Sequence, residues 1–146
     1  MPKDKPDHHD AELVLKLYDL RRETVMRQSR DRIIREFQPK VWEDVRSVAS
    51  DFANPLSVAF RQVSSYWEMA YGMARWEIVH AEYIVENSGE GILLYVKMQP
   101  FLERFREEFS PRAFLNTEWV ATRTEAGRRY VELFQARLAK LAAPAR

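Results

Sequence analysis

Residues 55–87 read PLSVAFRQVSSYWEMAYGMARWEIVHAEYIVEN, and this stretch decides the fold that the sequence predicts. Asn54 can cap a helix, and Pro55 suits the first helical position because proline has no N–H to lose there. Gly72 is the one residue of low helix propensity inside the stretch, and the next turn residues follow Asn87. The sequence therefore predicts one helix of about 33 residues, roughly 50 Å long at 1.5 Å per residue.

Apolar residues fall on two lines along this predicted helix when successive residues are placed about 100° apart. The first line holds Leu56, Phe60, Val63, Trp67, Ala70, Ala74, Ala81 and Val85. The second line holds Met69, Gly72, Trp76 and Tyr83. The narrow polar strip between them holds Ser57, Ser64, Glu68, Arg75, Glu82 and Glu86. A helix that is apolar almost all round is buried, so we expect either the other helices or a second copy of the chain to cover it.

Met69, Trp76 and Tyr83 are the residues that we expect at an interface. Protein interfaces are enriched in methionine and in rigid aromatic side chains, and these three share the second apolar line. This pattern favours a homodimer, or contact with another protein, as the role of that line.

The rest of the chain also has helical patterns. Asp7 or Asp10 can cap a first helix, which changes its apolar face near residues 28–31 and is expected to bend there. Pro39 ends that segment, and an amphipathic helix covers residues 40–52. A fourth segment keeps one apolar stripe from Gly91 to Ser110, so Pro100 is predicted to kink it rather than end it. The last helix carries apolar residues from Trp119 to Leu141, and residues 116–123 either join this helix or form a separate turn.

No run of alternating apolar and polar residues bounded by turn residues is present, so no strand is predicted. We therefore expect an all-α fold, a single-domain bundle of about five helices around the long third helix, over residues 1–146. Residues 1–9 are predicted to form a flexible leader, and residues 143–146 a tail.

Glu77 and His80 have the Glu-x-x-His spacing that supplies half of a di-metal site in carboxylate bundles. A second such motif is absent, and the only other histidines are His8 and His9 near the N-terminus. Both residues fall within apolar surface on the predicted helix, so we predict buried polar groups that other protein groups satisfy. A metal-binding bundle enzyme that uses Glu77 and His80 is the alternative interpretation. We expect no metal and no other cofactor.

Composition excludes several classes of function. There are no cysteines, which rules out disulfides, thiol nucleophiles and cysteine-ligated metals. Glycine-rich phosphate loops and G-x-S-x-G elbows are absent, so no enzyme class and no small-molecule ligand can be named. Neither a signal peptide nor a membrane-spanning run is present, which favours a cytoplasmic location. The basic residues are mostly arginine, as is typical of proteins from GC-rich bacterial genomes.

The densest basic stretch runs from Arg21 to Arg35 and could contact phosphates. Acidic residues interrupt it, the arginines are spread around the helix, and the net charge of the whole chain is only +1. Nucleic-acid binding is therefore a third hypothesis and not the expected function. The sequence favours a non-enzymatic domain that acts through protein–protein contact, as a homo-oligomer or with another protein.

Overall fold

The computed structural model describes residues 3–143, and all regular secondary structure within that range is helical. The predicted all-α class is confirmed. In chain order the elements are α1 (His8–Arg21), α2 (Thr24–Glu36), α3 (Trp42–Ser50), α4 (Ser57–Arg75), α5 (Ala81–Asn87), α6 (Glu90–Met98), the 3-10 turn η1 (Gln99–Phe101), α7 (Leu102–Glu108), α8 (Leu115–Arg123) and α9 (Glu125–Ala142).

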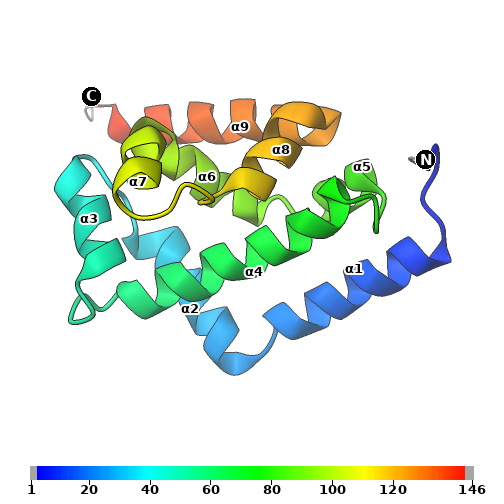
Figure 1. Ribbon diagram of the computed structural model, residues 1–146, viewed down its shortest axis with the longest axis horizontal. Helices are drawn as coiled ribbons and strands as arrows, with labels where there is room; N and C mark the ends of the chain where they lie inside the picture. The colour runs from blue at the N-terminus through cyan, green and yellow to red at the C-terminus, as the bar shows by residue number, and fades with distance from the viewer. Residues whose placement is uncertain (1–2, 144–146) are drawn as a thin grey trace.

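The predicted long third helix is wrong in one respect, because the chain turns between residues 76 and 80 and divides it into α4 and α5. Its central position is nevertheless correct. Helix α4 packs against α2, α3, α5, α6 and α8. In Figure 1 it crosses the middle of the molecule, with α1 and α2 below it and α8 and α9 above it. One side of α4 forms the core, and this side carries Phe60, Val63, Trp67, Ala70 and Ala74 of the predicted first apolar line.

Large aromatic side chains of α4 form the centre of that core. Trp67 and Tyr71 are 1% and 0% exposed, and their rings stack with centroids 5.3 Å apart. Gly91 of α6 lies directly against both rings, since a Cβ atom there would come within 2.6 Å of each. The predicted helix of residues 91–110 can start at this position because glycine lets its backbone approach α4 closely.

Two further boundaries lie where the sequence placed them. Asp7 caps α1 by accepting the main-chain N–H groups of His9 and Asp10 at 3.0 and 3.2 Å. Pro100 falls in η1, a tight turn that joins α6 to α7 without ending the run, as the predicted kink requires. Since α1 begins at His8, the last two residues of the predicted leader are helical. Residues 1–2 of the leader and 144–146 of the tail lie outside the described range.

Two boundaries differ from the prediction. The break between α1 and α2 lies at residues 22–23 rather than at residues 28–31. Glu23 causes it, because its carboxylate accepts the main-chain N–H groups of Val25 and Met26 at 3.1 and 2.9 Å and so starts α2. The last predicted helix is divided into α8 and α9, because the Thr124 hydroxyl accepts the N–H of Gly127 at 2.9 Å and caps α9.

Within residues 3–143, no helix combines the length and the apolar content that crossing a bilayer requires.

Candidate interaction surface on helix 4

Helix α4 ends in a Schellman turn. The N–H of Ile78 donates to the carbonyl of Met73 at 2.8 Å, and the N–H of Glu77 donates to the carbonyl of Ala74 at 3.1 Å. Glu77 occupies the left-handed position of this turn, with φ of 60°. Glycine usually fills that position because it has no Cβ to clash with the following carbonyl. A glutamate there gives no stop signal in the sequence, which is why one continuous helix was predicted.

The prediction that Glu77 is a buried carboxylate is wrong. Glu77 lies in the turn after α4 instead of within a helix, and its side chain is exposed. His80 is half-buried and caps α5, since its Nδ1 accepts the main-chain N–H of Tyr83 at 3.2 Å. Across residues 3–143, no group of three or more Asp, Glu or His side chains lies where it could hold a metal ion. The half-site suggested by Glu77 and His80 is not completed in that range.

The buried carboxylate next to this turn belongs to Asp10 of α1. Its side chain is 0% exposed, and it accepts the N–H of His80 at 2.9 Å, the N–H of Asp7 at 2.8 Å and the Lys3 ammonium at 3.1 Å. Burial alone would raise the pKa of Asp10, but these hydrogen bonds and the Lys3 charge outweigh it and lower the pKa to about 2. Asp10 therefore stays ionised and fixes the α4–α5 turn against α1.

Two glutamates of the predicted polar strip cap other helices. Glu68 of α4 accepts the main-chain N–H groups of Asn116 and Thr117 at 3.1 and 2.8 Å, at the start of α8. Glu82 of α5 accepts those of Glu125 and Ala126, both at 2.9 Å, at the start of α9. Carboxylates are favourable at helix N-termini, where the N–H groups lack partners within the helix. These two residues of the strip therefore assemble the bundle, whereas Arg75 and Glu86 are exposed.

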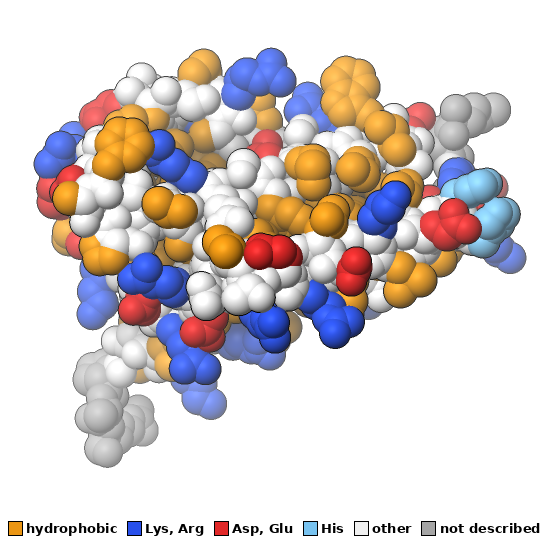
Figure 2. All heavy atoms as spheres, turned by 90° about the horizontal axis from the view of Figure 1, so that it is seen from below, with side chains coloured by type: hydrophobic (Ala, Val, Ile, Leu, Met, Phe, Trp, Pro, Cys, Tyr) orange, Lys and Arg blue, Asp and Glu red, His pale blue; other side chains and the backbone are white. Residues whose placement is uncertain are grey.

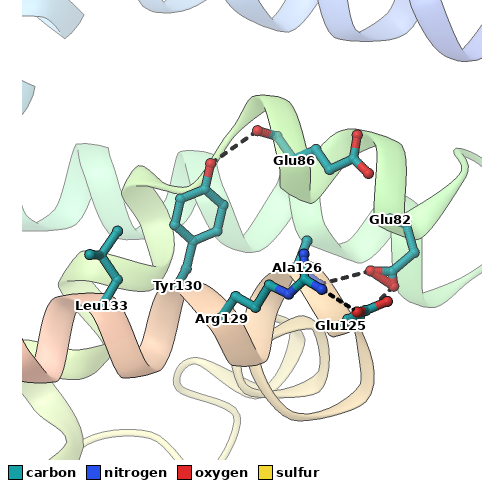
Figure 3. A pocket seen from close by; sticks show the side chains of 7 residues that line it. All are labelled: Glu82, Glu86, Glu125, Ala126, Arg129, Tyr130 and Leu133. Atoms are coloured by element: carbon teal, nitrogen blue, oxygen red, sulfur yellow. Dashed lines mark hydrogen bonds and ion pairs between the residues drawn. The ribbon is translucent and has the colours of Figure 1, made fainter.

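Glu82 also separates two hollows. The first, of about 310 Å³, lies between α5 and α9 and is lined by Glu82, Glu86, Glu125, Ala126, Arg129, Tyr130 and Leu133 (Figure 3). Its polar groups bond to one another: Arg129 pairs with Glu125 at 2.6 Å, and the Tyr130 hydroxyl donates to the carbonyl of Glu86 at 3.0 Å. The hollow is therefore part of the packing between α5 and α9.

The second hollow, of about 350 Å³, is lined by Lys3, Ala74, Glu77, Val79, His80, Ala81, Glu82 and Trp119. Serine, threonine and cysteine are absent from the lining of both hollows. Neither hollow therefore offers a serine, threonine or cysteine nucleophile. Three polar groups of the second hollow are already used, since Lys3 pairs with Asp10 while His80 and Glu82 accept main-chain N–H groups.

The side of α4 that points away from the core carries exposed apolar side chains. Val58 is 67% exposed, Met69 is 47% exposed and Trp76 is 74% exposed, with exposed Ser65 between them. We call these four residues the outer face of α4. None of these four residues is charged, and the exposed Arg61 and Arg75 flank them. Tyr83 does not belong to it, because the turn places this half-buried residue on α5.

The exposed tyrosine of α1 has cationic neighbours. Figure 2 shows the molecule from below, with hydrophobic side chains across the middle of the face and Lys and Arg side chains around them. On α1, Tyr18 is 48% exposed, but the guanidinium groups of Arg21 and Arg22 lie 4.9 and 5.8 Å from its ring centroid. Among the described cation–ring contacts, none covers the ring of Trp76 on the outer face of α4.

A family model described as "Domain of unknown function (DUF4760)" matches residues 6–124. The chain belongs to this family. The match to DUF4760 runs from just before α1 to Thr124, the cap of α9, and so includes Asp10, His80 and the outer face of α4. No curated protein matches the chain, and no solved structure matches it.

Several arginines of the predicted basic stretch in this DUF4760 chain have acidic partners. Arg30 points inward and contacts Glu90 of α6 through two nitrogens at 2.7 and 3.0 Å. Arg32 pairs with Glu36, and Arg35 pairs with Asp31, each at 2.9 Å. Such pairing reduces the positive field that would attract phosphates. That nucleic acid is not a partner stays a prediction.

Proposed function

We propose that this DUF4760 chain is a non-enzymatic self-association module that forms homodimers through the outer face of α4. One observation carries the proposal: Trp76 is 74% exposed at the end of the helix that forms the centre of the core. A tryptophan side chain buries about 150–250 Å² when it is covered, and it is among the residues that contribute most to interface energies.

The main chain around Trp76 is held in place, as expected for a residue that contributes to an interface. The Schellman turn holds the main chain that follows it, and Asp10 holds the turn through His80. An interface residue that is already ordered loses less conformational entropy on binding than a mobile one. Met69 and Val58 continue the apolar surface along the same rigid helix.

A second observation supports contact rather than catalysis. The buried or half-buried acidic groups near this face, Asp10, Glu68 and Glu82, accept main-chain N–H groups and serve the fold. A metal-dependent enzyme based on Glu77 and His80 is not proposed, because Glu77 lies exposed in the turn while His80 caps α5.

Sedimentation velocity over protein concentrations from low to several hundred micromolar tests the proposal. We expect the wild-type protein to pass from monomer to dimer, whereas Trp76→Glu stays monomeric because two charges would be buried in the contact. Leu141→Glu is the matched control, since Leu141 is 76% exposed but lies on α9. A wild-type protein that stays monomeric, or a Trp76→Glu variant that dimerises like the control, would overturn the proposal.

A further inference from the structure

The residues along the outside of α4 have the spacing of a helix–helix seam. Starting at Val58, steps of four and three residues alternate through Gln62, Ser65, Met69, Gly72 and Trp76. This alternation keeps the side chains on one nearly straight line, as in coiled coils. Val58, Ser65, Met69 and Trp76 are exposed, and the other two are half-buried. Gln62 already accepts the Ser29 hydroxyl of α2 at 2.6 Å, and Gly72 lies against Asn116 of α8. The four exposed residues are therefore the part of the line that is available for another helix.

The order of large and small residues along this line is symmetric about Trp67. Trp76 and Val58 lie equally far from Trp67 on its two sides, and so do Met69 and Ser65. In each of these pairs one member is large and the other is small.

We infer that two copies of the chain pair through α4 in antiparallel orientation, so that Trp76 of each copy packs on Val58 of the other. The two-fold axis crosses the outer face of α4 at the level of residue 67, whose own side chain points into the core. This inference rests on the proposed self-association and gives it a geometry. A two-fold contact is self-complementary by definition, and here it sets each large residue against a small one. A parallel pair would instead set Trp76 against Trp76 and leave a gap at Ser65.

Charges flanking the seam favour the same orientation. Arg61 and Arg75 lie beside it, and a parallel pair would bring each arginine next to its own copy. Like charges in contact are unfavourable. In the antiparallel pair Arg61 is level with Met73 and Arg75 is level with Ala59, and neither partner is charged, so both repulsions are avoided. It also places the C-terminus of one α4 beside the N-terminus of the other, where the helix dipoles attract.

The site that receives Trp76 contains more than Val58. Arg61 lies one turn further along α4, and its guanidinium is 4.1 Å from the ring centroid of Phe52, which is 74% exposed. Trp76 of the second copy would reach this arginine and the exposed ring beside it, and arginine packs well on indole. The pairing therefore offers each Trp76 both an apolar and a cationic neighbour.

The size of the seam sets the expected affinity. Helix α4 has 19 residues, which is about 28 Å of length. A standard interface buries about 800 Å² on each partner, and a single pair of helices of this length with its flanking side chains lies at or below that area. We therefore expect dissociation constants in the micromolar range, so that both monomer and dimer are observable.

Single cysteines test the geometry, because the chain contains none of its own. In the antiparallel pair, Ser65→Cys lies near the two-fold axis and should form a disulfide with its own copy on mild oxidation. Val58→Cys lies about 27 Å along the axis from its own copy and should not cross-link. A spin label at residue 58 should then report a distance of roughly 30 Å between copies.

The outcomes separate this inference from the proposed function. Efficient cross-linking of both variants would indicate a parallel pair and overturn the inference, although dimerisation through α4 would stand. Sedimentation that shows a dimer while neither variant cross-links would also overturn it, and would place the contact elsewhere. Absence of any dimer would instead contradict the proposed function itself. Leu141→Cys serves as the control for collisional cross-linking at an exposed site on α9.

Discussion

The carboxylate of Asp10 accepts the main-chain N–H of His80 at 2.9 Å, across 70 residues of sequence. This bond joins the first turn of α1 to the turn that follows α4. His80 in turn caps α5, so one buried carboxylate positions the end of one helix and the start of another. The exposed Trp76 lies in the same turn, which links the order of the proposed interface to Asp10.

Asp10→Ala should lower the free energy of unfolding by about 1–3 kcal/mol, because it leaves the buried N–H groups of Asp7 and His80 without their acceptor. Urea denaturation of both proteins measures the difference. Asp19→Ala is the control, since Asp19 is an exposed aspartate on the same helix. Equal losses for the two variants would contradict the anchoring role of Asp10.

The same carboxylate predicts a pH dependence. Its pKa is about 2 in the folded protein and 3.8 as the ordinary value, so the unfolded state binds a proton first as the pH falls. The stability that Asp10 contributes is therefore fully present above about pH 4 and is lost as the pH falls towards 2. Asp10→Asn should lack this part of the acid transition. Melting temperatures of both proteins at several pH values between about 5 and 2 measure the difference in stability. Melting temperatures that fall in parallel with pH would contradict the low pKa of Asp10.

Comparison of sequence and structure shows which signals were local. The kink at Pro100 and the buried side of α4 depend on nearby residues and periodicity, and both were predicted. The cap at Asp7 is local in the same way, and it was one of the two positions that the sequence offered. The turn at residues 76–80 was not, because it uses Glu77 where a glycine is usual and is held by Asp10 from far away in sequence. The roles of Glu68 and Glu82 as caps of α8 and α9 were missed for the same reason: only tertiary contact reveals them.

Glycine should be better than alanine at position 77. Both substitutions remove the same glutamate side chain, so their difference isolates the cost of φ at 60°, and glycine should be favoured by about 1 kcal/mol. At Ser65, an exposed position inside α4, the order should be reversed, because glycine is about 1 kcal/mol worse than alanine in a helix. Melting temperatures of the four variants give both differences. If the alanine variant is the more stable one at both positions, the left-handed conformation of residue 77 is contradicted.

Lys97 of α6 should make stability rise at alkaline pH. It is 5% exposed and donates to the carbonyls of Ile33 and Ile34 at 3.0 and 3.2 Å, near the end of α2. Burial lowers its pKa from 10.5 to about 8. Between these values the unfolded state binds more protons than the folded state, so stability increases with pH through the window.

Lys97→Met keeps the length of the side chain and removes the charge. The free energy of unfolding of the wild type, relative to this variant, should therefore rise between about pH 8 and pH 10. The tyrosines of the chain are present in both proteins, so their own titration cancels in the comparison. Urea denaturation at several pH values measures the difference, and a difference that stays constant with pH would contradict the shifted pKa.

Gly127→Ala should destabilise the protein, although helix propensity alone predicts a gain of about 1 kcal/mol inside α9. A Cβ atom at residue 127 would lie 2.0 Å from the carbonyl oxygen of Val120 and 2.6 Å from the Thr124 hydroxyl oxygen. The first is main chain and cannot move without shifting α8 relative to α9, so we expect a loss of about 1–3 kcal/mol or more. Ala136→Gly, at an exposed position of the same helix, measures the propensity term separately. A rise in melting temperature for Gly127→Ala would show that α8 and α9 do not approach each other as closely as described.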